Sequence, residues 1–313
     1  MRVVDKQVRI VRERSGQIDW EYNKTTGAIT AGLTQDFYVE ALNEAQDYLQ
    51  QQIIALKADL FLEDEIVSLV ANQEEYTLTN RIFGNTKIKS AQYSSNGQTD
   101  NYSPFPSKTL VERDTSTCTD PSFYIPLGTE ILVNPITTSS DGTIRVTSYK
   151  ELDDLDIRRG TVSGTPSGTS IIMAATDLYI YDLSQAEYIC ICDKFGNSLL
   201  RGGKVTSYDT GTNTFTLAAN VSTYLVSGYA LADLANKYVT IGRYSTTHSQ
   251  LPDTCERYLL TYAQKRAMQK EEQTGAIFED SELKTMLESI LGAYSEKTED
   301  VLDVPMLDPD IMF

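Results

Sequence analysis

The sequence predicts an α+β protein in which a small helical bundle is interrupted by a long antiparallel β portion, a barrel or sandwich, and is followed by an extended C-terminal arm. Apolar residues follow helical spacing near residue 40 and again after residue 253. Between them, short β-branched or aromatic runs alternate with clusters of Gly, Ser and Thr, which is typical of many short strands. Pro305 and Pro309 prevent a helix from running through the last segment.

With 313 residues, the chain can bury a substantial core and hold more than one domain. The predicted divisions are an N-terminal extended arm (1–31), a helical bundle (32–62 together with 251–295), a first β region (63–159), a second, inserted β region (160–250) and an extended C-terminal arm (296–313). The two β regions are divided at residues 160–170, where repeated Gly, Ser and Thr indicate a flexible connection.

Residues 1–31 alternate weakly between apolar and polar and break at Gly16 and Gly27, which indicates an extended arm or a short hairpin. Thr34 then suits the N-cap of a helix from about 35 to 58. Leu42 and Leu49 lie on its apolar stripe. We therefore expect both leucines in the bundle core.

In the second β region, residues 193–200 and 207–215 supply hairpin turns. Helices return afterwards. Pro252 and Asp253 begin one that continues to about residue 270, with Leu259 on its apolar face, and Asp280 or Ser281 caps another that continues to about 294, with Leu287 on its face. Because these stripes have no other evident partner, both helices should pack against the first, with Leu259 and Leu287 in the bundle core.

The formal charge of −17 argues against general nucleic-acid binding, which depends on Lys and Arg. No apolar run approaches the roughly 20 residues that span a membrane, so no membrane partner is expected. The N-terminus lacks the apolar core of a secretory signal, which predicts synthesis and folding in a cytoplasm. The four cysteines are too few and too scattered for a disulfide framework.

The charge is unevenly placed along the chain. Residues 1–14 hold five basic side chains against two acids, a net of +3, whereas residues 270–313 hold three lysines against twelve acids, a net of −9. Two interpretations remain open. The two ends are solvated, or they make complementary contacts between neighbouring copies of the chain.

Residues that could carry chemistry are few. The only histidine, His248, lies in a polar Ser/Thr stretch with no triad partners nearby, so we expect an exposed loop residue. Cys190 and Cys192 would share one face of a strand, but zinc needs two further ligands, so buried reduced thiols are expected. Residues 202–204, Gly-Gly-Lys, lack the spacing of a phosphate-binding loop and are expected to form a turn at a strand start.

An acidic run of Glu151, Asp153, Asp154 and Asp156 could hold a metal or act as paired carboxylates for glycoside cleavage. It lacks the glycine and the spacing of a calcium loop, so a solvated helical turn is expected. No catalytic residue, metal or cofactor is therefore predicted. Replacing His248 with Ala or Asp153 with Asn should leave assembly unchanged.

Three patches resemble the head-to-tail adaptor family of tailed phages, the ring proteins that bind below the portal. Residues 33–53 resemble the family's first bundle helix, residues 74–93 its Y-x-L-P strand, loop and following strand, and residues 247–272 its L-P-D helix returning to the bundle. Together they cover about a fifth of the chain. Thr79 stands where the family usually has proline, and the β portion from 94 to 250 is longer than in small adaptors.

This resemblance implies a structural virion protein, not an enzyme, that occupies the neck at the head–tail interface. It implies a homo-oligomeric ring, a dodecamer, that contacts the portal protein above and a tail nozzle or stopper protein below. Double-stranded DNA would pass through the prolonged channel without specific binding. Acidic walls would repel the phosphates at short range, which is compatible with a charge of −17 per chain.

The C-terminal arm is rich in both acids and apolar residues, unlike a solvated disordered tail. An extended strip of this kind suits a groove on a neighbour, and the resemblance implies that it reaches into the portal ring. The residues predicted to bind the portal are Val304, Met306, Leu307, Ile311, Met312 and Phe313. The alternative is an arm that folds back on its own subunit.

Two other functions compete with the adaptor. The β portion could be the binding module of a receptor- or glycan-binding virion protein, in which case an isolated 160–250 fragment should bind glycans. Paired acids could instead serve a peptidoglycan-cleaving enzyme, which would show muralytic activity. Ring formation on a portal would favour the adaptor.

Overall fold

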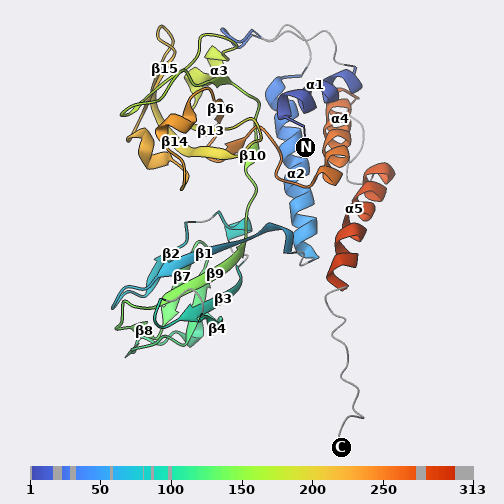
Figure 1. Cartoon of the computed structure of the whole chain (residues 1–313). Coiled ribbons are helices and arrows are strands. Elements are labelled where there is room, and N and C mark those ends of the chain that lie inside the picture. Colours follow the sequence, from blue (N-terminus) through green and yellow to red (C-terminus); the bar gives the residue numbers. More distant parts are fainter. Residues whose placement is uncertain are drawn as a thin grey trace, which may run out of the picture. The chain divides into compact units, whose positions relative to one another are not determined.

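The computed structural model describes residues 2–16, 23–28, 33–56, 59–79, 81–85, 88–97, 101–272 and 280–299. The predicted α+β fold class is confirmed. The chain divides into two compact units: a main unit, formed by residues 1–56 and 153–313, and an inserted β unit, formed by residues 57–152 (Figure 1). The second β region thus belongs to the same unit as the helices, and the boundary lies after Leu152 instead of near residue 160.

The long helices all belong to the main unit (Figure 1). They are α1 (Val4–Arg14), α2 (Gln35–Ala55), α4 (Glu256–Glu272) and α5 (Ser281–Glu299), with a short α3 (Ile180–Gln185) among the strands. Helices α2, α4 and α5 contact one another, and α1 contacts both α2 and α4. The expected bundle of one early and two late helices is therefore present, with α1 as a fourth member.

Local chemistry explains where these helices begin. The Thr34 hydroxyl accepts the backbone N–H of Phe37 at 3.0 Å, so Thr34 is the N-cap of α2 as expected. Asp280 caps α5 by accepting the amides of Glu282 and Leu283. Helix α2 ends at Ala55, three residues earlier than predicted. Of the expected core leucines, Leu42, Leu49 and Leu259 are fully buried, whereas Leu287 is only half-buried.

The prediction of an extended arm over residues 1–31 was wrong for its first half, which forms α1. Val4, Val8 and Val11 are all buried, and they recur at the four- and three-residue steps of one helical face. The backbone N–H of Val4 donates to Thr247 O at 2.9 Å, which attaches the start of the helix to the β part of the main unit. The apolar residues that we interpreted as alternating strand positions instead form a narrow apolar stripe on α1, among basic residues.

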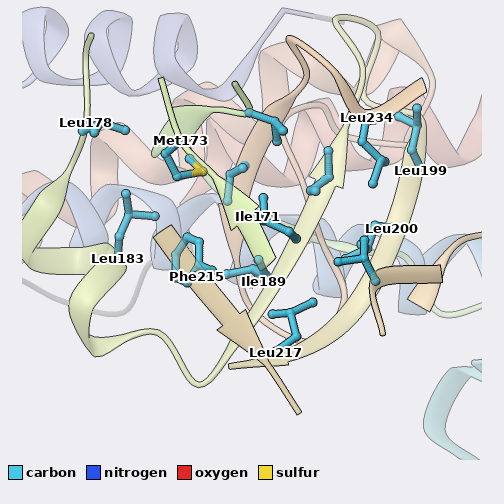
Figure 2. Close-up of a cluster of buried hydrophobic side chains, with 14 residues drawn as sticks. Ile171, Met173, Leu178, Leu183, Ile189, Leu199, Leu200, Phe215, Leu217 and Leu234 are labelled. Carbon is cyan, nitrogen blue, oxygen red and sulfur yellow. The ribbon is translucent and has the colours of Figure 1, made fainter. Parts of the chain in front are cut away.

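The β part of the main unit is a curled antiparallel sheet of six strands. Their order is β11 (Gly160–Thr161), β16 (Tyr238–Ile241), β13 (Tyr188–Cys192), β14 (Ser198–Asp209), β15 (Thr214–Leu217) and β12 (Ser170–Ile172). An isolated antiparallel bridge between Val162 and Met173 joins the two edges of the sheet. Buried side chains including Ile171, Ile189 and Phe215 fill the interior (Figure 2). A separate parallel pair joins β10 (Asp154–Leu155) to β17 (Ser245–Thr246).

This sheet corrects two expectations. Residues 160–170 do not divide two β regions, because they begin and end in strands of the same sheet. Residues 202–204 lie inside the long strand β14 and not in a turn. Gly202 adopts a φ of +59°, so the backbone there departs from regular strand geometry. The expected hairpin turns at 193–197 and 209–214 do connect β13 to β14 and β14 to β15.

The inserted β unit contains two larger sheets that share one core. One has the order β1 (Leu62–Ser68), β9 (Thr143–Tyr149), β3 (Ile88–Ser94) and β4 (Ser103–Phe105), and the other has the order β2 (Glu75–Thr77), β7 (Glu130–Asn134) and β6 (Phe123–Leu127). A short parallel pair joins β5 (Thr117–Cys118) to β8 (Ile136–Thr137). Tyr76, Phe105, Tyr124, Ile131 and Ile144 come from different strands and pack in this core.

Thr79, where the resemblance to the adaptor family would predict proline, has a structural role in the inserted β unit. Its backbone N–H and its hydroxyl both donate to the Glu65 carboxylate, at 2.8 and 2.6 Å. Proline has neither donor. Thr79 therefore links the chain just after β2 to Glu65 of β1.

Candidate functional site

Two of the four acids in the run at residues 151–156 are buried, contrary to the expected solvated helical turn, whereas Asp154 is exposed and Glu151 is half-buried. Asp153 and Asp156 are 1% and 4% exposed, and the run leads into strand β10 instead of a helix. Buried carboxylates are tolerated when they are paired and hydrogen-bonded. Both aspartates meet that condition through arginines that lie elsewhere in the main unit.

Asp153 pairs with Arg201 of β14. The guanidinium Nη2 donates to Asp153 Oδ2 at 2.7 Å, and Gln250 Nε2 donates to the same oxygen at 3.1 Å. Ser198 Oγ lies 3.3 Å from it. Three polar side chains thus converge on one oxygen of this buried carboxylate, so substituting Asp153 perturbs the core and not a solvated surface.

Arg159 is the centre of a second, larger group. Its side chain is 7% exposed and meets three carboxylates: Asp156 at 2.7 Å, Asp36 of α2 at 2.7 Å and Asp182 of α3 at 2.6 Å. Although burial opposes the charge on Arg159, Asp156 and Asp36 raise its pKa above the usual value. Arg159 therefore stays charged and ties α2, α3 and the start of the β part together.

Neutral hydrogen bonds extend this network along α2. Asn43 donates from Nδ2 to Leu155 O at 3.0 Å and accepts the Leu155 amide at 2.6 Å, so it pairs with β10 as another strand would. Gln46 donates to Asp153 O at 2.9 Å and accepts from Ser249 Oγ at 2.6 Å. Helix α2 is thereby fixed to the β part through specific polar contacts, and we call this set of contacts the seam.

The seam can fix geometry, but its acids do not converge for catalysis or for metal binding. Asp153 and Asp156 face different arginines, whereas glycoside cleavage needs two carboxyl groups flanking a substrate. Within the described ranges, no group of three or more His, Cys, Asp or Glu side chains could hold a metal ion. The structure therefore brings the buried acids of the run together with basic side chains.

The C-x-C pair is buried, as expected. Cys190 and Cys192 are both fully buried in β13 as free thiols. Burial raises the pKa of Cys192 to about 11 and also raises that of Cys190. Cys192 Sγ lies 3.4 Å from the hydroxyl of Thr247. Both cysteines act as small apolar groups of the strand.

His248 is half-buried and not exposed as predicted. Its Nδ1 lies 3.0 Å from the Thr247 hydroxyl, and burial lowers the pKa of the ring. The residue forms an isolated antiparallel bridge with Val3, just before α1. This bridge brings the chain's N-terminal residues against the loop that precedes α4.

Around His248 lies a cavity of about 450 Å³, which we call the basic pocket. Its walls are Arg2, Val3, Asp5, Lys6, Arg158, Lys194, Tyr238 and His248. Four of these side chains are basic and one is acidic. The pocket draws on α1, the loop after β10 and the β13–β14 turn, so it exists only when these parts of the main unit are folded together.

Two further grooves lie along the helices. One, of about 530 Å³, lies between α4 and α5 and includes Tyr258, Met286 and Ile290. The other, of about 550 Å³, lies between α2 and α4 and includes Phe37, Glu44 and Arg266. None of the described helices combines the length and the apolar character that crossing a lipid bilayer requires.

The predicted portal-binding residues lie outside the described residues, since the description ends at Glu299. The arm begins later than predicted, because residues 296–299 continue α5. Comparison with protein-family models finds no match, and comparison with curated proteins finds none either.

Helix α1, the seam and the basic pocket were not predicted from the sequence. A signal for part of the seam was present, because Asp156 and Arg159 are three residues apart and can meet within one turn of chain. Arg201 gave no such signal, since it lies 48 residues after Asp153. The basic pocket was represented only by the excess of positive charge in residues 1–14.

Proposed function

We propose that the chain is a structural virion protein, a head-to-tail adaptor that forms a homo-oligomeric ring below the portal and joins head to tail. The observation that carries this proposal is the order of elements. An early helix, α2, packs with two late helices, α4 and α5, and the β portion lies between them in sequence. The three patches that resemble the adaptor family fall on α2, on the β2–β3 region and on α4.

The seam is compatible with this role. A ring subunit has to present its contact surfaces at fixed angles, because a small error per subunit prevents closure of the ring. In the main unit, Arg159 and Asn43 fix α2 to the β part by ionic and amide contacts, which are more directional than apolar packing.

In this proposal the portal is reached by the C-terminal arm. The apolar residues Leu307, Ile311 and Phe313 are the principal anchors, in an extended segment that fills pockets on the portal. We expect deletion of residues 299–313 to leave a folded monomer and to abolish portal binding. Unchanged portal binding by the truncated chain would overturn this role for the arm.

The ring itself is tested by electron microscopy of the purified chain with and without its portal protein. The expected result is a ring on the portal, and the same proposal implies that the ring has twelve subunits. A protein that does not bind the portal, but whose β portion binds glycans, would support the receptor-binding alternative. Muralytic activity of the chain would instead support the enzyme.

A further inference from the structure

The basic pocket concentrates positive charge in a chain whose formal charge is −17. Its single acid is already engaged, because Asp5 Oδ2 accepts the backbone N–H of Arg158 at 3.2 Å. Two of its cations have partners: Arg2 lies 3.4 Å from Glu256, and Arg158 lies 3.6 Å from Asp177. The remaining two, Lys6 and Lys194, are exposed.

Lys6 and Lys194 make no ion pair with any residue in the part of the chain that the structure describes. Lys194 instead lies over the ring of Phe195, with its amine 4.8 Å from the ring centroid. Phe195 is 67% exposed at the tip of the β13–β14 turn. The pocket therefore offers uncompensated positive charge next to an exposed aromatic ring, with Val3 and Tyr238 as further apolar wall. Such a site fits a segment that alternates carboxylates with apolar side chains.

The chain contains a segment of that kind that begins at the last residue of α5. Residues 299–303 read Glu-Asp-Val-Leu-Asp, with three carboxylates around two apolar side chains. An extended chain places Asp300 and Asp303 about 10 Å apart. This short segment precedes residues 304–313, which hold all the apolar anchors proposed for the portal. Binding at the base of the arm thus leaves its end free.

We propose that the basic pocket of one subunit binds the acidic residues 299–303 of a second copy of the chain. This inference rests on the proposed ring, in which each contact joins two different surfaces of neighbouring subunits. Two copies that each have a formal charge of −17 repel one another overall. Contact between them is therefore favoured where a local basic site meets an acidic segment. The same net charge disfavours DNA as the occupant, because the duplex would have to approach the whole acidic chain.

Zero-length cross-linking of the full chain tests the proposal. Equal amounts of ¹⁴N- and ¹⁵N-labelled protein are mixed at high concentration and treated with a water-soluble carbodiimide, which joins amines to carboxylates in contact. We expect mass spectrometry to find mixed-isotope links from Lys6 and Lys194 to residues 299–303. Links within one isotope alone would show that each arm folds onto its own subunit, and would overturn the proposal, as would the absence of these links.

Variants test whether the pocket's charge is responsible. Lys194→Glu should lower the yield of mixed-isotope links from Lys6 by about fivefold, since an attractive pair becomes a repulsive one. Lys204→Glu, the same charge change at an exposed position of β14 outside the pocket, should leave it unchanged. Equal effects of the two variants, or loss of the links on adding an equimolar DNA duplex, would overturn the proposal. Portal binding by the full chain is a separate measurement, so the two proposals can fail independently.

Discussion

Adjacent arginines provide a direct test of the seam. Replacing Arg159 with Met removes the cation that faces Asp156 and Asp182, whose side chains are only 6% and 9% exposed. A buried ion that loses its partner typically costs about 3–5 kcal/mol of stability. Asp36 adds little, because its side chain is 67% exposed. We therefore expect Arg159→Met to lower the free energy of unfolding by about 3–5 kcal/mol.

Arg158→Met is the matched control. Arg158 is 39% exposed, its partner Asp177 is 70% exposed at 3.6 Å, and its guanidinium lies 5.3 Å from the ring centroid of Tyr238. Exposed ion pairs and exposed cation–π contacts each contribute roughly 1 kcal/mol or less, so we expect a loss of about 1 kcal/mol. The same substitution at two neighbouring arginines should thus lower the free energy of unfolding by amounts that differ severalfold.

Urea unfolding followed by circular dichroism at 222 nm is the appropriate assay, because all the described α-helices lie in the main unit. Adding Asp156→Asn to Arg159→Met should recover at least about 1 kcal/mol, since the amide removes one of the two buried carboxylate charges that face Arg159 and can still accept the Ile241 N–H that Asp156 accepts at 2.7 Å. Two arginine variants that differ by less than about 1 kcal/mol, or a double variant that loses the sum of the single effects, would refute the reasoning.

Three further outcomes are expected. Leu49→Ala should cost about 2–5 kcal/mol because Leu49 is fully buried, whereas half-buried Leu287→Ala should cost less, and equal costs would contradict the bundle packing. In native protein at pH 8, a thiol reagent should modify Cys118 first, because Cys118 is partly exposed whereas the other three thiols are buried; rapid reaction of all four without denaturant would disprove this. The protected residues are Cys190, Cys192 and Cys255. Sedimentation of the purified chain at a concentration well below that used for cross-linking should show monomers, and a stable large oligomer without the portal would contradict portal-templated assembly.

The helices α2, α4 and α5 could be predicted because their signals are local. The apolar stripe of a helix and its capping residue lie within a few turns of each other in the sequence. In α2, for example, the capping residue Thr34 directly precedes the helix that carries the stripe. Helix α1 carries the same signal more weakly, because only three valines face the core among several charged residues. With so few apolar positions, helical and strand spacing are hard to distinguish.

The strand order of the β part and most contacts of the seam could not be predicted, because they depend on pairs distant in sequence. The edges of the six-stranded sheet come from residues 160–161 and 170–172, which pair with strands 40 or more residues away. From its sequence context Asp153 is indistinguishable from a surface acid, and its burial is tolerable because Arg201 and Gln250, far along the chain, donate to its carboxylate. A sequence that places acids among Gly, Ser and Thr therefore gives no sign of whether they are buried.

The same long-range dependence links folding of the main unit to the proposed assembly. Lys6 lies on α1, Arg158 follows β10 and Lys194 lies in the β13–β14 turn, so none of them forms a basic site by sequence proximity. They meet only because Val4 N–H binds Thr247 O and the Asp5 carboxylate binds the Arg158 amide. A chain in which α1 has not docked thus lacks the pocket that is proposed to receive its neighbour. Incompletely folded copies would then be excluded from the ring by the absence of the site itself.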